Sequence, residues 1–331
     1  MTYAGSTYFD RVPRSTSDDG RSFELQVTTS DDLGSLFRAL CREDAFDVAE
    51  LSLSNYLTLR GNGDGRYVAI PVFPSRSFRH GQIYVNAGSG IVDAAQLAGA
   101  RVAIPEYHMT AAVWMRAFLE HDFGVSPNEI SWCTPADALA YMEEVDFPVP
   151  PDVSLTATSE PLDLLLEEGK VDALFTVKAP PSYERGSPAV GRLFPNYREV
   201  EEAYYGRTGF FPIMHTVVLR TARYRSNPEL ALELLECFHD AKEAGFRRLT
   251  DLNALAIAHP WLGQDLERVG VFFGGDPFAY GLSENESTLQ ALLDYHIEQG
   301  LSREHLTLAD VFAHETFEWA QPADSFGDRR W

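Results

Sequence analysis

Cysteine is scarce in this sequence, with only three such residues among 331. Cys41, Cys133 and Cys237 lie far apart, are odd in number and form no CxxC pair. Disulfide frameworks and zinc sites use evenly paired or closely spaced cysteines, so the pattern predicts neither. We expect three buried thiols with a structural role.

Long apolar runs are also missing. No stretch approaches the about 18 apolar residues that a membrane-spanning helix needs. Residues 1–20 contain five charged side chains and no apolar core of the kind found in secretory signals. We therefore expect a cytoplasmic protein with no membrane partner.

Positive charge is in short supply. The chain has 27 Lys and Arg against 49 Asp and Glu, which gives a formal net charge of −22. A surface this acidic repels phosphate backbones and anionic headgroups, which excludes general nucleic-acid binding and attachment to membrane surfaces. Residues 60–116 are the exception, because they hold six arginines and only three acids. A small anionic ligand therefore remains compatible with the sequence.

The sequence is rich in apolar side chains. Hydrophobic residues make up 45% and aromatic residues 12% of the chain, enough for a substantial core. The length predicts two domains of ordinary size or one large domain.

Short apolar strands alternate with amphipathic helices, which predicts an α/β fold with mainly parallel sheets. The expected strands are Phe23–Val27, Phe46–Leu51, Tyr67–Phe73, Gln82–Asn86, Val102–Pro105, Ile130–Cys133, Val171–Val177 and Ile213–Arg220. The expected helices are one capped by Ser30, then His108–Phe123, Pro135–Glu144, Ser159–Glu168 and three or four more that open with Asn227–Pro228. The Pro/Gly-rich stretch Ala179–Pro195 is the expected crossover between lobes.

Polar side chains gather where two predicted strands give way to helices. One group is Glu106, Tyr107, His108 and Thr110, and the other is Glu50, Ser52, Ser54 and Asn55. Ligands of open α/β sheets gather at the carboxyl ends of strands, and a helix N-terminus offers free N–H groups to an anion. Both groups are candidate ligand contacts, although Thr110 is equally suited to cap its helix and Glu50 to be a paired structural acid.

A basic loop supplies a further group of candidates, Arg76, Arg79 and His80. The planar fork of an arginine binds a carboxylate with two hydrogen bonds, and a histidine exchanges a proton near neutral pH. The alternative is a solvated loop whose arginines pair with surface carboxylates. His108 and His215 join His80 as candidate acid–base groups, with a structural role as the alternative for each.

Four stretches of the chain resemble a known family. They are FDVAELSLSNY at 46–56, PVFPSRSFRH at 71–80, PEYHMTAA at 105–112 and GFFPIMHTVVLR at 209–220. On these stretches the chain resembles the 4,5-dihydroxyphthalate decarboxylase group, which has the two-lobed fold of type 2 periplasmic binding proteins. One departure stands out, because His108 occupies the position where the family pattern has Gln, which bears on the identity of the substrate.

The resemblance implies an architecture. We expect two α/β lobes, each a mainly parallel sheet flanked by helices, joined by a two-stranded hinge with the ligand cleft between them. The first lobe is expected to comprise residues 1–100 plus 206–331, and the second residues 101–205.

The resemblance also implies a decarboxylase acting on a hydroxylated aromatic acid or a similar cyclic carboxylate. This reaction needs an anchor for the spectator carboxylate, a polarised phenol and a general acid at the carbon that loses the carboxyl group. We expect catalytic roles for His80, His108, His215 and Glu106. We expect substrate contacts from Arg76, Arg79, Glu50, Ser52, Ser54, Asn55, Tyr107 and Thr110.

No organic cofactor is expected, because the aromatic ring itself can hold the electrons. Glu106 and the three candidate histidines could supply ligands to a divalent ion, but no HxxxH or HxH spacing supports a metal. Two alternatives are a solute-binding protein for a small anion and another lyase or biosynthetic enzyme on the same scaffold. The oligomeric state of the chain is left open.

Overall fold

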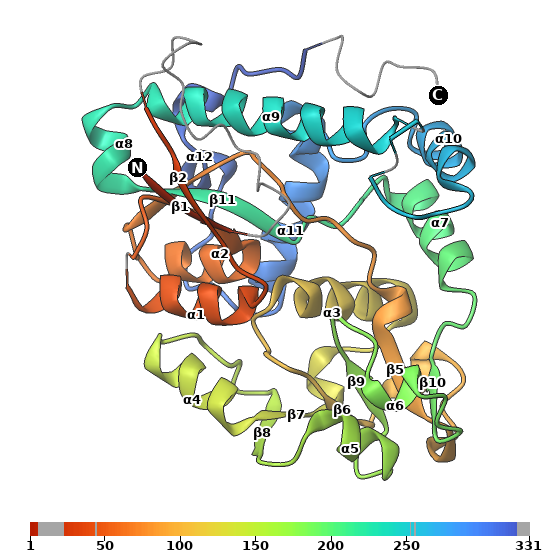
Figure 1. Ribbon diagram of the computed structural model, residues 1–331. Coiled ribbons are helices and arrows are strands. Elements are labelled where there is room, and N and C mark those ends of the chain that lie inside the picture. Colours follow the sequence, from red (N-terminus) through yellow and green to blue (C-terminus); the bar gives the residue numbers. More distant parts are fainter. Residues whose placement is uncertain (6–22, 44, 252, 255, 323–331) are drawn as a thin grey trace.

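The protein is organised around two β-sheets (Figure 1). The computed structural model describes residues 1–5, 23–43, 45–251, 253–254 and 256–322. One sheet lies in the upper half of Figure 1 and the other in the lower half, and helices flank both. We call each sheet with its helices a lobe. The charged residues between Asp10 and Asp19, on which the expectation of a cytoplasmic protein rests, lie outside the described residues.

The first sheet has the strand order β2-β1-β3-β11-β4. Its strands are β1 (Thr2–Gly5), β2 (Gln26–Thr29), β3 (Val48–Ser52), β4 (Tyr67–Ile70) and β11 (His215–Arg220). Strand β1 pairs in parallel with β2 and β3, whereas β11 runs antiparallel to β3 and β4.

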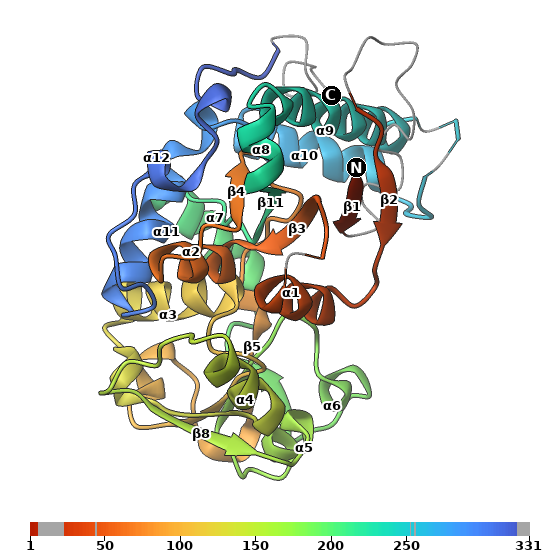
Figure 2. The same cartoon turned by 90° about the vertical axis from the view of Figure 1, so that its left-hand side faces the viewer.

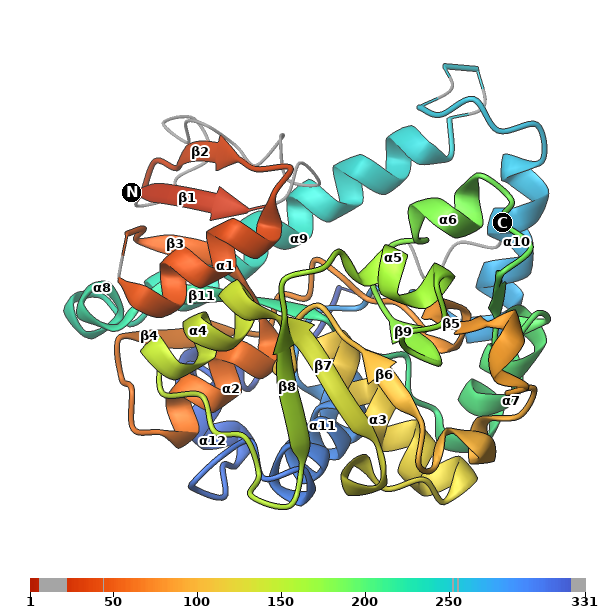
Figure 3. The ribbon, with the colours of Figure 1, turned by 90° about the horizontal axis from the view of Figure 1, so that it is seen from below.

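The second sheet has the order β10-β5-β9-β6-β7-β8, and Figure 3 shows β6, β7 and β8 side by side. Its strands are β5 (Ile83–Asn86), β6 (Arg101–Ala103), β7 (Ser131–Pro135), β8 (Ser154–Thr158), β9 (Ala173–Phe175) and β10 (Val190–Arg192). Strand β5 runs antiparallel to β9 and β10, and the other pairs are parallel.

The two-lobed α/β fold with mainly parallel sheets is confirmed, and each sheet is mixed through one antiparallel strand, β11 in the first and β5 in the second. The reason lies in the chain path. Strands β5 and β11 are the first strands that the chain forms after it crosses from one lobe to the other. They run away from the crossing point, while their neighbours run toward it.

Helices surround both sheets. They are α1 (Leu33–Arg42), α2 (Leu53–Gly61), α3 (Thr110–Phe123), α4 (Ala136–Glu144), α5 (Leu162–Glu167), α6 (Pro181–Glu184), α7 (Tyr197–Thr208), α8 (Thr221–Ser226), α9 (Leu230–Leu249), α10 (Leu262–Phe273), α11 (Glu286–Glu298) and α12 (Leu308–Val311). The cap of α1 is Asp32, whose carboxylate accepts from the Ser35 N–H at 3.1 Å, and not Ser30 as expected. A carboxylate at this position also interacts favourably with the helix dipole.

Two crossing segments, residues 71–82 and 193–214, join the lobes. They pair with each other, because the Ser77 N–H donates to the Pro212 carbonyl at 3.1 Å and the Met214 N–H donates to the Ser75 carbonyl at 2.8 Å. The Pro/Gly-rich stretch 179–195 is not a crossover, since it contains α6 and β10 of the second lobe and the crossing segment begins only near its end. Strand β5 also belongs to the second sheet, although it precedes the expected boundary at residue 101.

The chain returns to the first lobe with β11 and continues there. Helix α8 packs on β11 and β4, α9 packs on β4, and α11 packs on α2 and α3. None of the helices in the described ranges combines the length and the hydropathy needed to cross a bilayer.

A buried ion pair ties α9 to the segment after α10. The Lys242 ammonium is fully buried and donates to the Asp276 carboxylate, to the Phe278 carbonyl at 3.1 Å and to the Gln321 side chain at 3.0 Å. Breaking such a pair from one side leaves an uncompensated buried charge.

We expect Lys242→Met to lower the free energy of unfolding by about 3–5 kcal/mol, because Asp276 loses its cation. The matched control is Arg198→Gln, which removes an exposed pair with Glu202 on α7 and should cost less than about 1 kcal/mol. Urea denaturation followed by circular dichroism measures both. Equal stability of the two variants would contradict the structural role of Lys242.

Candidate functional site

A cavity of about 560 Å³ lies between the two lobes. We call it the interlobe cavity. Its wall combines the N-terminal part of α1, the carboxyl ends of β3, β6 and β9, the start of β11 and both crossing segments. Six of the predicted site residues line it, namely Ser52, Asn55, Arg79, Glu106, Thr110 and His215. The volume suits a ligand of one aromatic ring with its substituents.

A Glu–His pair borders the first-lobe side of the cavity. The Nδ1 atom of His215 lies 2.7 Å from Oε1 of Glu50, which is 1% exposed. The antiparallel register of β3 and β11 places His215 opposite Ser52 and Val217 opposite Glu50, so the pair is a diagonal contact. An ionised carboxylate only accepts, so Nδ1 donates and Nε2 has no protein partner in the part of the chain that the structure describes.

Glu106 enters the cavity from the second lobe, directly after β6. Its Oε1 accepts from the Asn55 side chain at 3.3 Å and its Oε2 from Arg38 Nε at 3.4 Å. Burial raises the pKa of the Glu106 carboxyl, while Arg38 and Asn55 favour its ionised form. Both contacts are long for hydrogen bonds to a charge, which leaves the carboxyl group loosely held.

Arg79 is the cation of the first crossing segment in this cavity. Its Nε lies 3.2 Å from the Met214 sulfur, and no carboxylate of the described residues lies within ion-pair distance. Burial lowers the pKa of the guanidinium to about 10, so the group remains charged at neutral pH. Glu201 acts on Arg79 from beyond that distance, and a partly buried cation with no contacting carboxylate favours an anion in the space that it faces.

Hydrogen bonds link the two lobes along the wall of the cavity. Thr110 Oγ1 lies 3.0 Å from Ser52 Oγ and accepts from the Ser54 N–H at 3.0 Å. Thr110 therefore does not cap its own helix, and α3 begins without any side-chain cap. The N–H groups in the first turn of a helix have no partner within the helix, so this end of α3 can bind an anion.

Apolar side chains complete the wall. Phe37 packs edge-on against His215 with ring centroids 4.9 Å apart, and the side chains of Met109, Met214 and Val177 border the same space. Flat aromatic ligands pack well between such groups.

Six predicted residues do not line the cavity, namely Glu50, Ser54, Arg76, His80, Tyr107 and His108. Arg76 donates to the Ala279 carbonyl and to the Asn285 side chain. His80 is buried against Phe118, with ring centroids 4.0 Å apart, and burial lowers its pKa to about 4. Tyr107 is buried below the Arg116 guanidinium, which stands 3.9 Å from its ring centroid.

His108 and Ser54 belong to a buried network next to the cavity. His108 Nε2 bonds to the Pro148 carbonyl at 2.7 Å, its Nδ1 lies 3.3 Å from the Thr58 hydroxyl, and Ser54 Oγ lies 3.0 Å from His296 Nε2. Burial lowers the pKa of His108 and of His296 to about 3, so both rings are neutral at physiological pH. His108, the departure from the family pattern, therefore has structural contacts and does not line the cavity.

Arg38 and Lys178 line the cavity but were not among the predicted site residues. Arg38 lies on α1 of the first lobe, where its position on the polar side of an amphipathic helix is typical of a surface residue. Lys178 follows β9, and its place at the end of a strand was the signal that could have identified it. It is exposed at the rim.

No cluster of three or more His, Cys, Asp and Glu side chains in the described ranges has a geometry that could hold a metal ion. The candidate ligands are separated, because Glu106 and His215 border the cavity while His80 and His108 lie in the protein interior.

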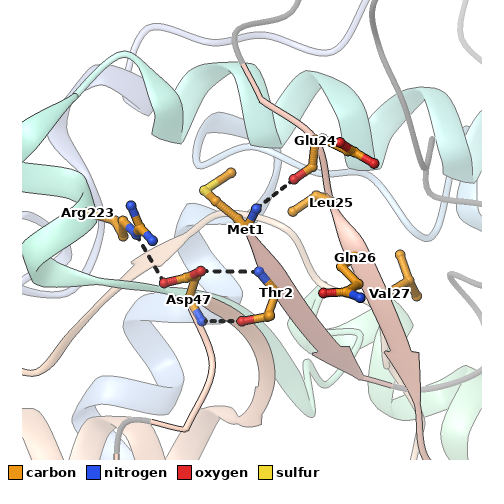
Figure 4. Close-up of a pocket in the computed structure, with 8 residues that line it drawn as sticks. All are labelled: Met1, Thr2, Glu24, Leu25, Gln26, Val27, Asp47 and Arg223. Atoms are coloured by element: carbon orange, nitrogen blue, oxygen red, sulfur yellow. Dashed lines mark hydrogen bonds and ion pairs between the residues drawn. The ribbon is translucent and has the colours of Figure 1, made fainter.

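A second hollow, of about 600 Å³, lies at the edge of the first sheet (Figure 4). Its polar groups already pair with one another. Asp47 accepts from Arg223 at 3.1 Å and from the Thr2 N–H at 3.1 Å, and the Met1 amino group donates to the Glu24 carbonyl. The hollow lacks the unpaired cation and the acid–base groups of the interlobe cavity.

Comparisons with known proteins identify relatives of the chain. A 4,5-dihydroxyphthalate decarboxylase from Comamonas testosteroni is 35% identical over 285 residues, which cover 85% of this chain and 86% of the relative. A protein of the same name from Pseudomonas putida is 37% identical over 172 residues, 51% of this chain and 66% of the relative. No protein-family model matches.

Solved structures share the fold at low identity. The periplasmic aliphatic sulphonate binding protein SsuA from Escherichia coli aligns with a TM-score of 0.52 at 14% identity, over 97% of this chain and 94% of that one. The ligand-binding component of an ABC-type import system from Staphylococcus aureus aligns with a TM-score of 0.54 at 11% identity, over 97% and 98%. The two-lobed fold is therefore that of periplasmic binding proteins.

The buried His108 should make stability depend on pH. Unfolded histidine takes up a proton below about pH 6.5, whereas folded His108 has a pKa of about 3, so the unfolded state binds more protons in this window and stability falls as the pH falls. In His108→Gln this loss is absent, because glutamine does not titrate. Between neutral pH and pH 5 we expect the free energy of unfolding of the wild type to fall by about 2 kcal/mol more than that of the variant.

Urea denaturation at a series of pH values measures this difference, and the other buried histidines cancel because both proteins contain them. Substrate preference should be unchanged. Parallel stability curves for the two proteins would contradict a neutral, buried His108.

Proposed function

Because the chain belongs to the 4,5-dihydroxyphthalate decarboxylase family, we propose that it removes one carboxyl group as CO₂ from a hydroxylated aromatic dicarboxylate of the 4,5-dihydroxyphthalate type. The observation that carries the proposal is Arg79, which has no carboxylate within ion-pair distance, in a cavity that also presents Glu106 and the Glu50–His215 pair. We propose that the reaction needs neither an organic cofactor nor a metal.

Anchoring of the spectator carboxylate is assigned to Arg79. A guanidinium without a protein carboxylate can bind the carboxylate of a ligand with two parallel hydrogen bonds. The uncapped first turn of α3 and the ammonium of Lys178 add positive potential on the second-lobe side. The aromatic ring is expected between Phe37 and the side chains of Met109 and Met214.

The general base is His215. Its Nδ1 donates to Glu50, so Nε2 can accept the proton of the hydroxyl group that is para to the departing carboxyl group. The Glu50 carboxylate stabilises the imidazolium that forms, as the carboxylate of a catalytic triad does for its histidine.

The general acid is Glu106. Electron density from the ionised hydroxyl passes through the ring to the carbon that bears the carboxyl group, and this carbon accepts a proton from the Glu106 carboxyl. The carbon–carbon bond then breaks, CO₂ leaves, and the bonding electrons restore the aromatic ring. A carboxyl group whose pKa is raised by burial is suited to this step, because it can hold a proton closer to neutral pH.

Anion capture without chemistry is the second candidate function. It is favoured by the solved structures that share the fold, which are named as binding proteins. Simple capture requires a cation but neither a base nor an acid, so the Glu50–His215 pair and Glu106 argue for the decarboxylase. Cell fractionation also distinguishes the two functions, because binding proteins that serve import work outside the cytoplasm, whereas we expect this chain inside it.

The direct test is CO₂ release by the purified chain from 4,5-dihydroxyphthalate and a panel of hydroxybenzoates, before and after dialysis against a chelator. We expect turnover of the dicarboxylate that survives dialysis. Arg79→Gln should lower kcat/KM about 10- to 150-fold, because one charged hydrogen-bond pair contributes about 1.5–3 kcal/mol.

The control for Arg79 is Arg207→Gln, which removes an exposed pair with Asp122 away from the cavity and should retain wild-type activity. If no substrate is turned over and a bound ligand is recovered unchanged, the decarboxylase proposal is wrong and the binding-protein alternative is favoured. Wild-type kinetics in Arg79→Gln would remove the anchor assignment.

The base assignment predicts a graded pair of variants. His215→Gln should lower kcat about 100- to 10,000-fold, because the general base is lost. Glu50→Gln should lower kcat less, because the ring remains but loses its orienting carboxylate. His121→Gln, at an exposed pair with Glu298, is the control and should leave kcat unchanged. Steady-state kinetics over a pH series measures all three, and equal activity of His215→Gln and His121→Gln would exclude His215 as the base.

A further inference from the structure

Arg38 is shared between two carboxylates of the second lobe. Its Nη1 donates to Asp137 of α4 at 2.8 Å, whereas its Nε stands 3.4 Å from Glu106. Figure 2 shows α1, which carries Arg38, lying above α4. Asp137 is exposed, but Glu106 is 13% exposed in the cavity wall. Arg38 therefore makes its short contact with the exposed Asp137 and a longer, weaker contact with Glu106 in the cavity wall.

Few ionisable groups act directly on Glu106, although Asp31, Asp32, Arg79, Lys178 and His215 line the same cavity. From α1 it faces Arg38 and Cys41, from α4 Asp137 and Tyr141, and from α2 the neutral Asn55. Burial raises the pKa of the Cys41 thiol to about 12 and also raises the pKa of the Tyr141 hydroxyl, so both are neutral. Among the described residues Arg38 is the one cation within ion-pair distance of Glu106, and it favours the ionised form of the carboxyl group.

We propose that Arg38 couples occupation of the interlobe cavity to protonation of Glu106, because the departing carboxylate of the substrate binds the Arg38 guanidinium in place of Glu106. This inference rests on the proposed decarboxylase and deepens it. Glu106, buried and without its cation, takes up one proton from solvent. Arg38 is a positioning residue for the general acid.

The cycle balances and returns the site to its starting state. The substrate carboxylate on Arg38 brings its ring carbon next to Glu106, which transfers its proton to that carbon and becomes a carboxylate. The bond to the carboxyl carbon breaks, its electron pair returns to the ring, and CO₂ leaves as a neutral molecule. His215 then returns to the product oxygen the proton that it took from the hydroxyl group. Arg38 then has no substrate anion and pairs again with the ionised Glu106. One proton from solvent is consumed for each CO₂ released.

The coupling explains why a carboxylate and an arginine meet in a cavity built for an anion. An ionised Glu106 without a cation would repel the substrate, and a permanently protonated Glu106 would need no arginine. Sharing Arg38 between Glu106 and the substrate gives an acid that forms only when the substrate is bound.

The test counts protons on binding of phthalate, which has both carboxylates but no hydroxyl group to drive decarboxylation. Isothermal titration calorimetry near neutral pH, in buffers of different ionisation enthalpy, gives the number of protons taken up. We expect about one proton per bound phthalate in the wild type. Glu106→Gln should take up no proton, because glutamine does not titrate. Arg38→Gln should also take up none, because Glu106 without its cation is already protonated before phthalate binds.

Arg42→Gln is the matched control. Arg42 lies one turn further along α1, also pairs with a carboxylate of α4, Glu144, and also stands 5.2 Å from the Tyr141 ring centroid, but it does not contact Glu106. It should retain the wild-type uptake. A general effect of lost contacts between α1 and α4 would change Arg42→Gln as much as Arg38→Gln.

Binding of phthalate to the wild type without proton uptake, or equal uptake by the wild type and Glu106→Gln, would overturn the coupling. Failure of phthalate to bind to a protein that releases CO₂ from 4,5-dihydroxyphthalate would also overturn it, and would leave the decarboxylase standing. Absence of CO₂ release despite proton-coupled binding would overturn the decarboxylase instead.

Discussion

The pairing of the two crossing segments determines where the functional side chains lie. Two backbone hydrogen bonds, from Ser77 to Pro212 and from Met214 to Ser75, hold the segments in antiparallel register. One segment carries Arg79, and the other leads directly into β11, which begins at His215. Because side chains of a strand alternate between its faces, a slip of one residue would turn His215 away from the cavity and separate it from Glu50. The same few bonds that join the lobes therefore align Arg79, the proposed anchor, with His215, the proposed base.

Charge is distributed differently in space than along the chain. The window 60–116 is net positive, yet of its six arginines, all of them described, only Arg79 lines the interlobe cavity. Arg66 and Arg101 pair with Asp64 and Asp172, while Arg60 binds a backbone carbonyl and Arg116 is buried among aromatic rings. The lining of the cavity thus contains three cationic side chains, Arg38, Arg79 and Lys178, and only one of the six arginines of this window.

The alternation of strands and helices predicted the α/β class, and the family resemblance implied the two lobes. The strand-to-helix junctions predicted the group of residues around the carboxyl ends of β3 and β6, because strand ends converge at one edge of an α/β sheet. Glu50, Asn55 and Glu106 were found in this way. Whether a loop residue faces the cavity or the interior depends on packing, which sequence spacing does not reveal. Arg76, His80 and Arg79 were therefore equally good candidates. Arg38 could not be found from its pattern, since an arginine on the polar side of a helix becomes a cavity residue only when the second lobe lies against it.

Among the nine histidines of the chain, the local surroundings determine which can transfer a proton at neutral pH and which have a structural role. His80, His108 and His296 are buried without a carboxylate within hydrogen-bond distance among the described residues, and burial holds their pKa values near 3 to 4, too low for proton transfer at neutral pH. His215 differs because a carboxylate supports one ring nitrogen while the other borders the cavity. A binding scaffold needs only a cation for its anion. In the proposed mechanism the first lobe adds a base and the second lobe adds an acid, so the two proton transfers occur together only where both lobes contact the same ring.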